Sequence, residues 1–158
     1  MDLPITAMKE QDCAELATFL EKVDHSFRPT LSSRIEFRSF AVKVLSKGVV
    51  LKVVDEDKVV AVTIFYANDQ VEKTAYLSVV AVLDECRGRG IGKRLVAEVI
   101  QMSRSRGMRR ITVQMNPENE AAVALYTSLG FRMCGKPNGD HVRADSIFMD
   151  LSLSRSLC

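Results

Sequence analysis

Apolar residues recur at helical spacing in two segments of the first third of the chain. In residues 12–23 the stripe falls at positions i, i+3, i+4 and i+7, which are Leu16, Phe19, Leu20 and Val23. A second stripe is formed by Phe37, Phe40, Ala41 and Val44. Ser33 and Glu36 have the spacing of a capping box ahead of this stripe, and Gly48 is a typical terminator after it. The pattern therefore predicts two helices.

After residue 48 the pattern changes to runs rich in β-branched residues. Residues 49–54 and 59–66 are two such runs, and the polar turn Asp55–Lys58 between them is typical of a hairpin. Further strands are predicted over 3–8, 74–82, 110–115, 131–135 and 146–153. The last two are separated by a polar loop, Lys136–Asp145.

Helical spacing returns in two segments of the second half. Residues 91–106 place Ile91, Leu95, Val96 and Val99 on one side, and Gly107 closes the segment. Asn116-Pro117 predicts another helix start, because asparagine caps free N–H groups and proline fits the first helical position. Ala122, Leu125 and Leu129 line the inner face of this second helix, and Gly130 ends it.

The order of predicted elements indicates a three-layer mixed α/β fold. A strand, two helices and a hairpin come first, followed by β-α-β-α-β-β. The strand–helix–strand unit over 74–115 should place its two strands parallel, whereas the rest of the sheet can be antiparallel. The length of 158 residues fits a single domain over 1–158.

Composition and charge exclude several classes of protein. The 22 Lys+Arg against 20 Asp+Glu give a net charge of +2, without the basic excess of a dedicated nucleic-acid or polybasic membrane binder. The longest uncharged stretch, Ala121–Phe131, is far shorter than the roughly 20 residues that span a bilayer. The N-terminus shows no signal-peptide pattern. We therefore expect a cytoplasmic protein.

The cysteines and histidines give no pattern typical of a metal site. Cys13, Cys86, Cys134 and Cys158 are scattered without a C-x-x-C pair, and they are expected to be reduced thiols. Neither of the two histidines has neighbours at metal-ligand spacing. We expect no metal.

The most informative stretch joins the strand over 74–82 to the helix over 91–106. Three glycines, Gly88, Gly90 and Gly92, stand at the helix entrance, where glycine permits unusual backbone angles and close approach to N–H groups. The unpaired N–H groups there carry partial positive charge. Four cations lie in the same stretch: Arg87, Arg89, Lys93 and Arg94. The combination predicts a site for a polyanion, most simply a pyrophosphate.

Two familiar phosphate-binding motifs do not fit the spacing. A nucleoside-triphosphate P-loop requires Gly-Lys followed by Ser or Thr, but Gly92-Lys93 is followed by Arg94. The dinucleotide fingerprint Gly-x-Gly-x-x-Gly would need glycine at Lys93, and no carboxylate ends the next strand at Met115-Asn116.

The same stretch resembles motif A of the GNAT superfamily of N-acetyltransferases, Arg/Gln-x-x-Gly-x-Gly/Ala, at Arg87–Gly92. Residues 119–131 resemble a second block of that family, Asn-x-x-Ala-x-x-Leu-Tyr-x-x-x-Gly-Phe. The resemblance is strong over 74–131. It implies a mostly antiparallel sheet of six to seven strands with one parallel, splayed pair, flanked by about four helices. It also implies acyl transfer from acetyl-CoA.

The resemblance also implies roles for individual residues. The pyrophosphate of the cofactor would be wrapped by the turn, whose residues are Arg87, Gly88, Arg89, Gly90, Ile91 and Gly92, with Lys93 or Arg94 close by. The strand end Ala81, Val82 and Leu83 would pair with the pantetheine arm, because the splayed strands leave backbone groups unpaired. Asn119 matches a position that contacts pantetheine. Tyr126 matches the general acid that protonates the leaving thiolate.

The sequence leaves open which group is the base that deprotonates the acceptor. The strand over 74–82 has no acidic residue, so the alternatives are a water chain or one of Glu72, Asp69, Tyr76 and Glu36. His141 in the 136–145 loop could approach an acceptor. Phe27 and Arg28 lie between the first two helices, where Arg28 could bind an acceptor carboxylate.

We therefore expect a cytoplasmic N-acetyltransferase that moves acetyl from acetyl-CoA directly to a primary amine, such as that of an amino sugar or amino acid. The alternatives are a protein N-terminal or lysine acetyltransferase and a non-catalytic acyl-CoA-binding or regulatory module on the same fold. No nucleic acid or membrane is expected as a partner. The sequence leaves open whether the protein forms a homodimer.

Overall fold

The computed structural model describes residues 3–27, 29–135 and 146–153. Their strands form one seven-stranded sheet in the order β1-β2-β3-β4-β5-β7-β6. The strands are β1 Ile5–Ala7, β2 Val49–Asp55, β3 Lys58–Tyr66, β4 Thr74–Val82, β5 Arg110–Met115, β6 Arg132–Cys134 and β7 Ile147–Ser152. The α-helices of this part are α1 Cys13–Val23, α2 Phe37–Lys47, α3 Ile91–Ser105 and α4 Glu120–Ser128. The predicted loop over 136–145, with His141, and Arg28 lie outside the described residues.

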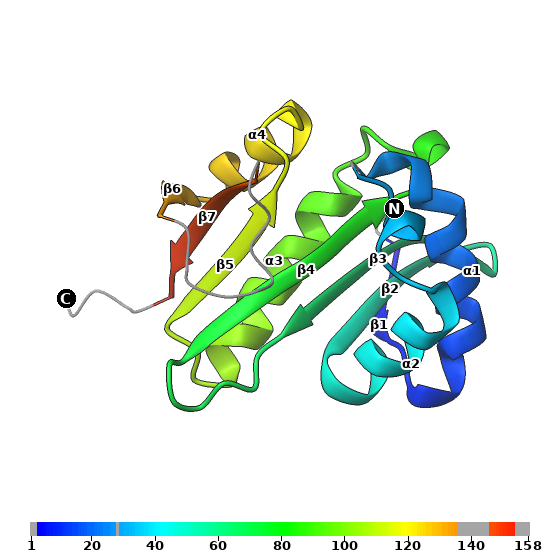
Figure 1. Ribbon diagram of the computed structural model, residues 1–158, viewed down its shortest axis with the longest axis horizontal. Helices are drawn as coiled ribbons and strands as arrows, with labels where there is room; N and C mark the ends of the chain where they lie inside the picture. The colour runs from blue at the N-terminus through cyan, green and yellow to red at the C-terminus, as the bar shows by residue number, and fades with distance from the viewer. Residues whose placement is uncertain (1–2, 28, 136–145, 154–158) are drawn as a thin grey trace.

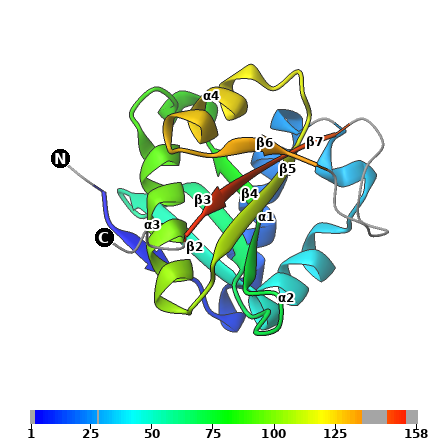
Figure 2. The same cartoon turned by 90° about the vertical axis from the view of Figure 1, so that its left-hand side faces the viewer.

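The sheet is the middle of three layers. Helices α1 and α2 lie on one side of it, and α3 and α4 lie on the other (Figures 1 and 2). Helix α3 turns the leucine and valine residues of its inner face into the core, where Leu95, Val96 and Val99 are fully buried. The predicted fold class, including the mixed seven-stranded sheet and the four helices, is confirmed for the described residues.

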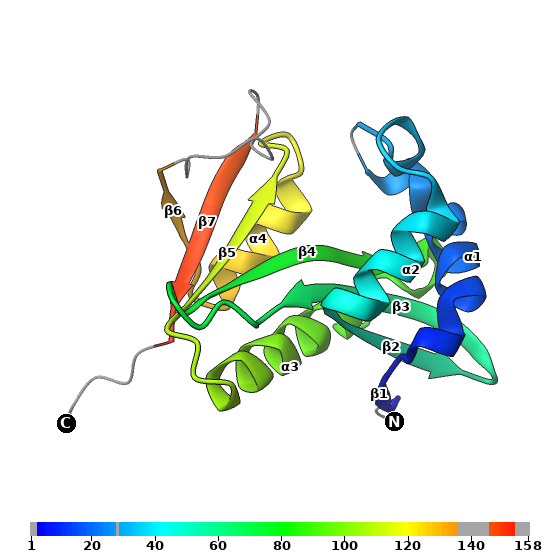
Figure 3. The ribbon, with the colours of Figure 1, turned by 60° about the horizontal axis from the view of Figure 1, so that its bottom comes forward.

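Strands β4 and β5 form the parallel pair, and they separate after a few residues. The pairing covers only Thr74–Leu77 against Arg110–Val113, although β4 continues to Val82. All other neighbouring strands are antiparallel. Figure 3 shows the sheet opening in a V between β5 and the far end of β4. The edge of β4 beyond Leu77 therefore has no partner strand on the β5 side.

A bulge in β4 coincides with the point of separation. Ile64 of β3 is opposite Val79, but the next residue, Phe65, is opposite Leu77, so Ser78 is the extra residue. A bulge bends its strand and increases the local twist. The bulge therefore turns the end of β4 away from β5.

The predicted start of α2 needs a correction. The capping residue is Glu36, whose carboxylate accepts hydrogen bonds from the N–H groups of Arg38 at 2.7 Å and Ser39 at 3.1 Å. These bonds lower the pKa of Glu36. Ser33 instead belongs to a separate 3-10 turn, Leu31–Ser33. The capping-box spacing between Ser33 and Glu36 was misleading because the glutamate reaches forward to two free N–H groups.

The predicted start of α4 is also wrong by one turn. Asn116 and Pro117 form a tight turn, in which the Asn116 Oδ1 accepts from the Glu118 N–H at 2.8 Å. The helix begins at Glu120, and its N-cap is Asn119, whose Oδ1 accepts from the Ala122 N–H at 3.1 Å. Both asparagines satisfy backbone donors, but only the second opens the helix.

Candidate functional site

A cavity of about 720 Å³ lies where β4 and β5 diverge. One wall comes from the segment between α1 and α2, including Phe27, Leu31 and Arg34. The opposite wall comes from the end of β5 and from α4, including Gln114 and Tyr126. The far end of β4 and the turn that follows it complete the lining. The cavity therefore joins elements that are distant in sequence.

The turn before α3 presents its backbone to this cavity. Gly88 and Gly90 have φ of +83° and +76°, which side-chain-bearing residues rarely adopt, and an added Cβ at either would meet open space. The first backbone hydrogen bond of α3 runs from the Arg94 N–H to the Gly90 carbonyl at 3.0 Å. The N–H groups of the first helical turn precede that bond and are free for an anion.

Most of the residues predicted to wrap a pyrophosphate line the cavity. Those that do are Arg87, Gly88, Gly90, Ile91, Gly92 and Lys93. Arg89 does not, and its guanidinium lies 4.0 Å from the Asp55 carboxylate. In the predicted pantetheine strand, Ala81 and Val82 line the cavity. Leu83 is buried instead, and its N–H donates to the Val60 carbonyl of β3 at 2.9 Å.

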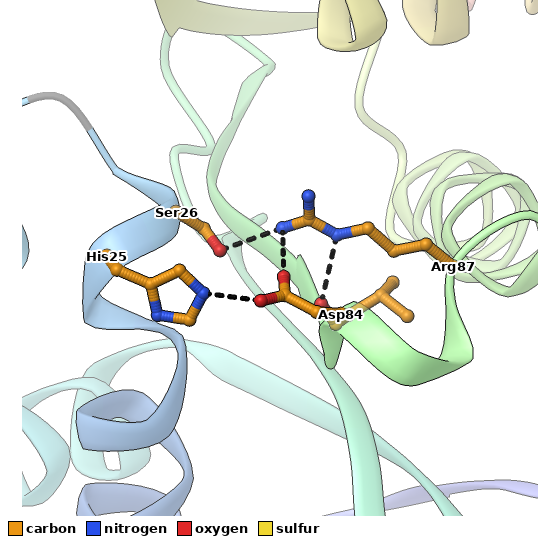
Figure 4. Close-up of polar contacts among 5 residues, drawn as sticks. His25, Ser26, Asp84 and Arg87 are labelled. Atoms are coloured by element: carbon orange, nitrogen blue, oxygen red, sulfur yellow. Dashed lines mark hydrogen bonds and ion pairs between the residues drawn. The ribbon is translucent and has the colours of Figure 1, made fainter.

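Arg87 is held in place by a polar cluster that connects the α1–α2 segment with the turn (Figure 4). Its guanidinium donates to the Ser26 Oγ at 2.7 Å and lies 3.3 Å from the Asp84 carboxylate. The other oxygen of Asp84 is 2.7 Å from the His25 Nε2. The hydrogen bond from His25, together with the charges of His25 and Arg87, lowers the pKa of Asp84. The cluster fixes the guanidinium at the rim of the cavity.

Tyr126 comes from α4 and is only 5% exposed while lining the cavity. Its ring packs against Phe131, with ring centroids 5.2 Å apart. Burial, and secondarily the nearby Tyr76, raises the pKa of the Tyr126 phenol well above its usual value. The hydroxyl therefore stays protonated throughout the physiological range, as a proton donor must.

Asn119 also lines the cavity, but one of its polar atoms is already used. The Oδ1 caps α4, so the side chain offers its amide N–H groups to a ligand. The residue therefore combines a structural role with the predicted cofactor contact.

The bulge at Ser78 is secured from β3. The Thr63 hydroxyl is fully buried and donates to the Val79 carbonyl at 2.8 Å. This bond fixes the orientation of the peptide that follows the bulge. Sequence reasoning did not single out Thr63, because a threonine in a strand is ordinary.

Replacing Thr63 by valine is expected to reduce the free energy of unfolding by about 1–3 kcal/mol, because the Val79 carbonyl would lose its donor inside the core. Thr63→Ser keeps the hydroxyl and serves as the control. Urea titration of the three proteins measures the effect. A Thr63→Val protein as stable as the parent would show that this bond does not hold the bulge.

The structure separates the candidate bases. Tyr76 lines the cavity. Asp69, Glu72 and Glu36 are not among the lining residues; Asp69 accepts from the N–H groups of Val71 and Glu72, and Glu36 caps α2. The carboxylate among the described lining residues is Glu118, in the turn before α4, and sequence reasoning missed it. The strongest indication of Glu118 in the sequence was its position between the strand over 110–115 and Asn119.

The rest of the described chain adds three observations. No helix in residues 3–27, 29–135 and 146–153 is long and apolar enough to cross a bilayer. Within the same ranges no three His, Cys, Asp or Glu side chains gather as metal ligands would. Cys13, Cys86 and Cys134 are free thiols.

Curated relatives match a segment of the chain. A 5-NmdU N-acetyltransferase of Pseudomonas phage PaMx11 is 37% identical over 60 residues, which are 38% of this chain and 41% of the relative. N-alpha-acetyltransferase 30 of Schizosaccharomyces pombe is 34% identical over 56 residues, 35% of this chain and 37% of the relative. The matched segments thus span about two fifths of these relatives.

Solved structures match over nearly the whole chain. An acetyltransferase of the GNAT family from Staphylococcus aureus Mu50 superposes with a TM-score of 0.79 at 16% identity, covering 97% of this chain and all of that one (100%). The Salmonella typhimurium protein yncA, solved with its cofactor acetyl-CoA, has a TM-score of 0.76 at 20% identity and covers 100% of this chain and 98% of its own. These likenesses show the fold. The family model described as the acetyltransferase (GNAT) family matches residues 11–131, and the chain therefore belongs to this family.

Proposed function

We propose that the protein is an N-acetyltransferase that moves an acetyl group from acetyl-CoA to a primary amine. The observation that carries the proposal is that one cavity joins the glycine turn before α3, the unpaired edge of β4 and the buried phenol of Tyr126. An anion site, an extended-chain site and a proton donor are the three parts that acyl transfer from a diphosphate-bearing thioester requires.

The residues present fit acetyl-CoA. The positive-φ glycines leave open space in front of the first N–H groups of α3, and Arg87 and Lys93 stand beside them, which suits a diphosphate. The edge of β4 beyond Leu77 offers backbone groups to the amides of a pantetheine arm. Acetyl-CoA, when bound, supplies an activated acyl group on a good leaving thiol.

The acetyl group would pass directly from acetyl-CoA to the amine, and residues of this chain would assist that step. The amine nitrogen forms a bond to the acetyl carbon, the C–S bond breaks, and its electron pair leaves on sulfur. Tyr126 would give its proton to that sulfur, and the proton that nitrogen loses would pass to solvent or to the phenolate that this leaves. The products are an N-acetyl amine and free CoA thiol. Backbone N–H groups of β4 near the bulge are suited to stabilise charge on the carbonyl oxygen.

The acceptor we favour is a small molecule with a primary amine, such as an amino sugar or amino acid. A protein N-terminus is the second candidate, because one relative is named as an N-alpha-acetyltransferase. A panel of amino sugars, amino acids and short peptides, assayed for free CoA thiol and by mass spectrometry, separates the two. Acetylation of peptides alone would favour the second candidate.

A non-catalytic acyl-CoA-binding module is the rival class, since fold alone does not settle function. Calorimetry with acetyl-CoA and the same amine panel separate the rivals. Binding of acetyl-CoA without release of thiol across the whole panel would favour the module. No binding of CoA or acetyl-CoA at millimolar concentration would overturn both. We further propose that the protein works in the cytoplasm.

Arg87→Gln is expected to weaken CoA binding about tenfold, because a guanidinium fixed at the rim of the cavity contributes a charge-assisted contact to phosphate. The measurement is the CoA dissociation constant as a function of salt. Arg104→Gln, in the last turn of α3 and therefore far from the turn that holds Arg87, is the matched control and should bind as the parent does. Equal affinity of the two variants would exclude Arg87 from the phosphate site.

A further inference from the structure

Gln114 has a buried polar atom that has no partner among the described residues. The residue is 8% exposed, and its Nε2 donates to the Ser146 Oγ at 2.9 Å. Its Oε1 is buried and has no hydrogen-bond partner in the described part of the chain. Buried side-chain acceptors are nearly always satisfied, so an unpaired one is a place where a water molecule or a ligand can donate a hydrogen bond. The hydrogen bond to Ser146 holds the amide group in place.

The position of Gln114 puts this residue at the opening, where an acceptor would meet the thioester. The pairing of β4 with β5 ends at Leu77 and Val113. Ser78 and Gln114 are therefore the first residues of the two strands beyond the point of separation. Side chains alternate along a strand, so Gln114 shares a face with Thr112, which is paired with Tyr76. Gln114, Ser78 and Tyr76 all line the cavity. This face is opposite the one that α3 covers, so an amine would reach the opening from the side away from the glycine turn.

The charges around the cavity fit an uncharged amine better than an ammonium group. Among the described residues, those that line the cavity and carry a titratable group are Arg34, Tyr76, Cys86, Arg87, Lys93, Glu118 and Tyr126. Three of these are cations, and the one carboxylate among them, Glu118, is exposed. A neutral amide oxygen can hold an amine N–H without the stabilisation of the protonated form that a carboxylate would give. The nitrogen therefore keeps the lone pair with which it attacks.

We propose that the Oε1 of Gln114 is the acceptor subsite, which takes a hydrogen bond from the attacking primary amine and favours amines of α-amino type over alkylamines of lysine type. An α-amino group with a pKa near 7.7–8.0 has a substantial neutral fraction at physiological pH, roughly a fifth to a third, whereas a lysine-type amine near 10.4 is almost entirely protonated. The inference rests on the proposed function and names its substrate class.

The test compares Gln114→Met with the parent protein. Methionine has a similar size but no strong acceptor, and Ser103→Ala is the matched control because Ser103 Oγ is the other buried atom without a partner among the described residues. Calorimetry measures CoA binding and the binding of glycinamide to CoA-loaded protein, and kinetics separate KM from kcat for glycinamide and n-butylamine. We expect Gln114→Met to weaken glycinamide binding and raise its KM about tenfold, with CoA affinity unchanged. Ser103→Ala should change neither.

A second variant, Gln114→Glu, covers the case in which Gln114→Met does not fold. A carboxylate would hold the amine as ammonium, so the ascending limb of kcat/KM for glycinamide should move to higher pH. Unchanged glycinamide binding in Gln114→Met, or an unmoved limb in Gln114→Glu, would overturn the subsite. A loss of CoA affinity with unchanged glycinamide KM would overturn it too, because the donor would then belong to the pantetheine arm. If the parent binds CoA and glycinamide but releases no thiol, the proposed function fails while the binding comparison still tests Gln114.

Discussion

Gly90→Val is expected to abolish CoA binding, with a loss of affinity of about 100-fold or more. Gly90 is the N-cap of α3 with φ of +76°, and the site of its missing Cβ faces open space. A β-branched side chain would strain this backbone and fill the space in front of the N–H groups that should bind the diphosphate. Calorimetry with CoA measures the effect.

The chain offers a close control for this variant. Gly107 has φ of +81°, also faces open space, and lies just beyond the opposite end of α3, away from the cavity. Gly107→Val should carry a similar backbone cost, about 1–2 kcal/mol or more, while CoA binding stays intact. If the two variants lost CoA affinity equally, the effect would be a general loss of stability and the turn would not be the diphosphate site.

Tyr126→Phe is expected to lower kcat by about 10²–10⁴ with little change in CoA affinity, because the ring still packs against Phe131 and only the proposed proton donor is lost. Steady-state kinetics with acetyl-CoA and calorimetry with CoA separate the two effects. Tyr66→Phe is a suitable control, since Tyr66 is a partly buried tyrosine of β3 that is not among the lining residues. Full activity of Tyr126→Phe at every pH would exclude the acid role.

The raised pKa of Tyr126 also predicts how the protein responds to alkali. The phenol ionises near pH 10 in the unfolded chain and at higher pH in the folded one, so burial of the neutral form stabilises the fold below about pH 10. This contribution is lost as the pH rises further. Urea unfolding between pH 8 and 11 should show a steeper alkaline loss of stability for the parent than for Tyr126→Phe. Parallel curves would contradict the raised pKa.

Much of the fold follows from local patterns. The spacing of apolar residues gave β4 as 74–82 and β5 as 110–115, and both are observed with those bounds. It gave α3 to within one residue at its C-terminal end. These elements are long and strongly periodic, and a buried face leaves little freedom in their type. The errors lie at the starts of α2 and α4, where several polar residues compete to cap the same free N–H groups.

In the candidate site, too, some features follow from the sequence and others depend on the tertiary structure. The sequence by itself determined the glycine-and-arginine turn, because positive φ and free N–H groups are properties of a few consecutive residues. Only the tertiary structure decided that Ser26 binds Arg87 and His25 binds Asp84, and that the bulge of β4 is held by Thr63. It alone also left the oxygen of Gln114, a residue of the cavity lining, without a partner in the described part of the chain. The reason is physical: strand separation, burial and unused hydrogen-bonding capacity depend on which distant segments meet, and local periodicity carries no information about that.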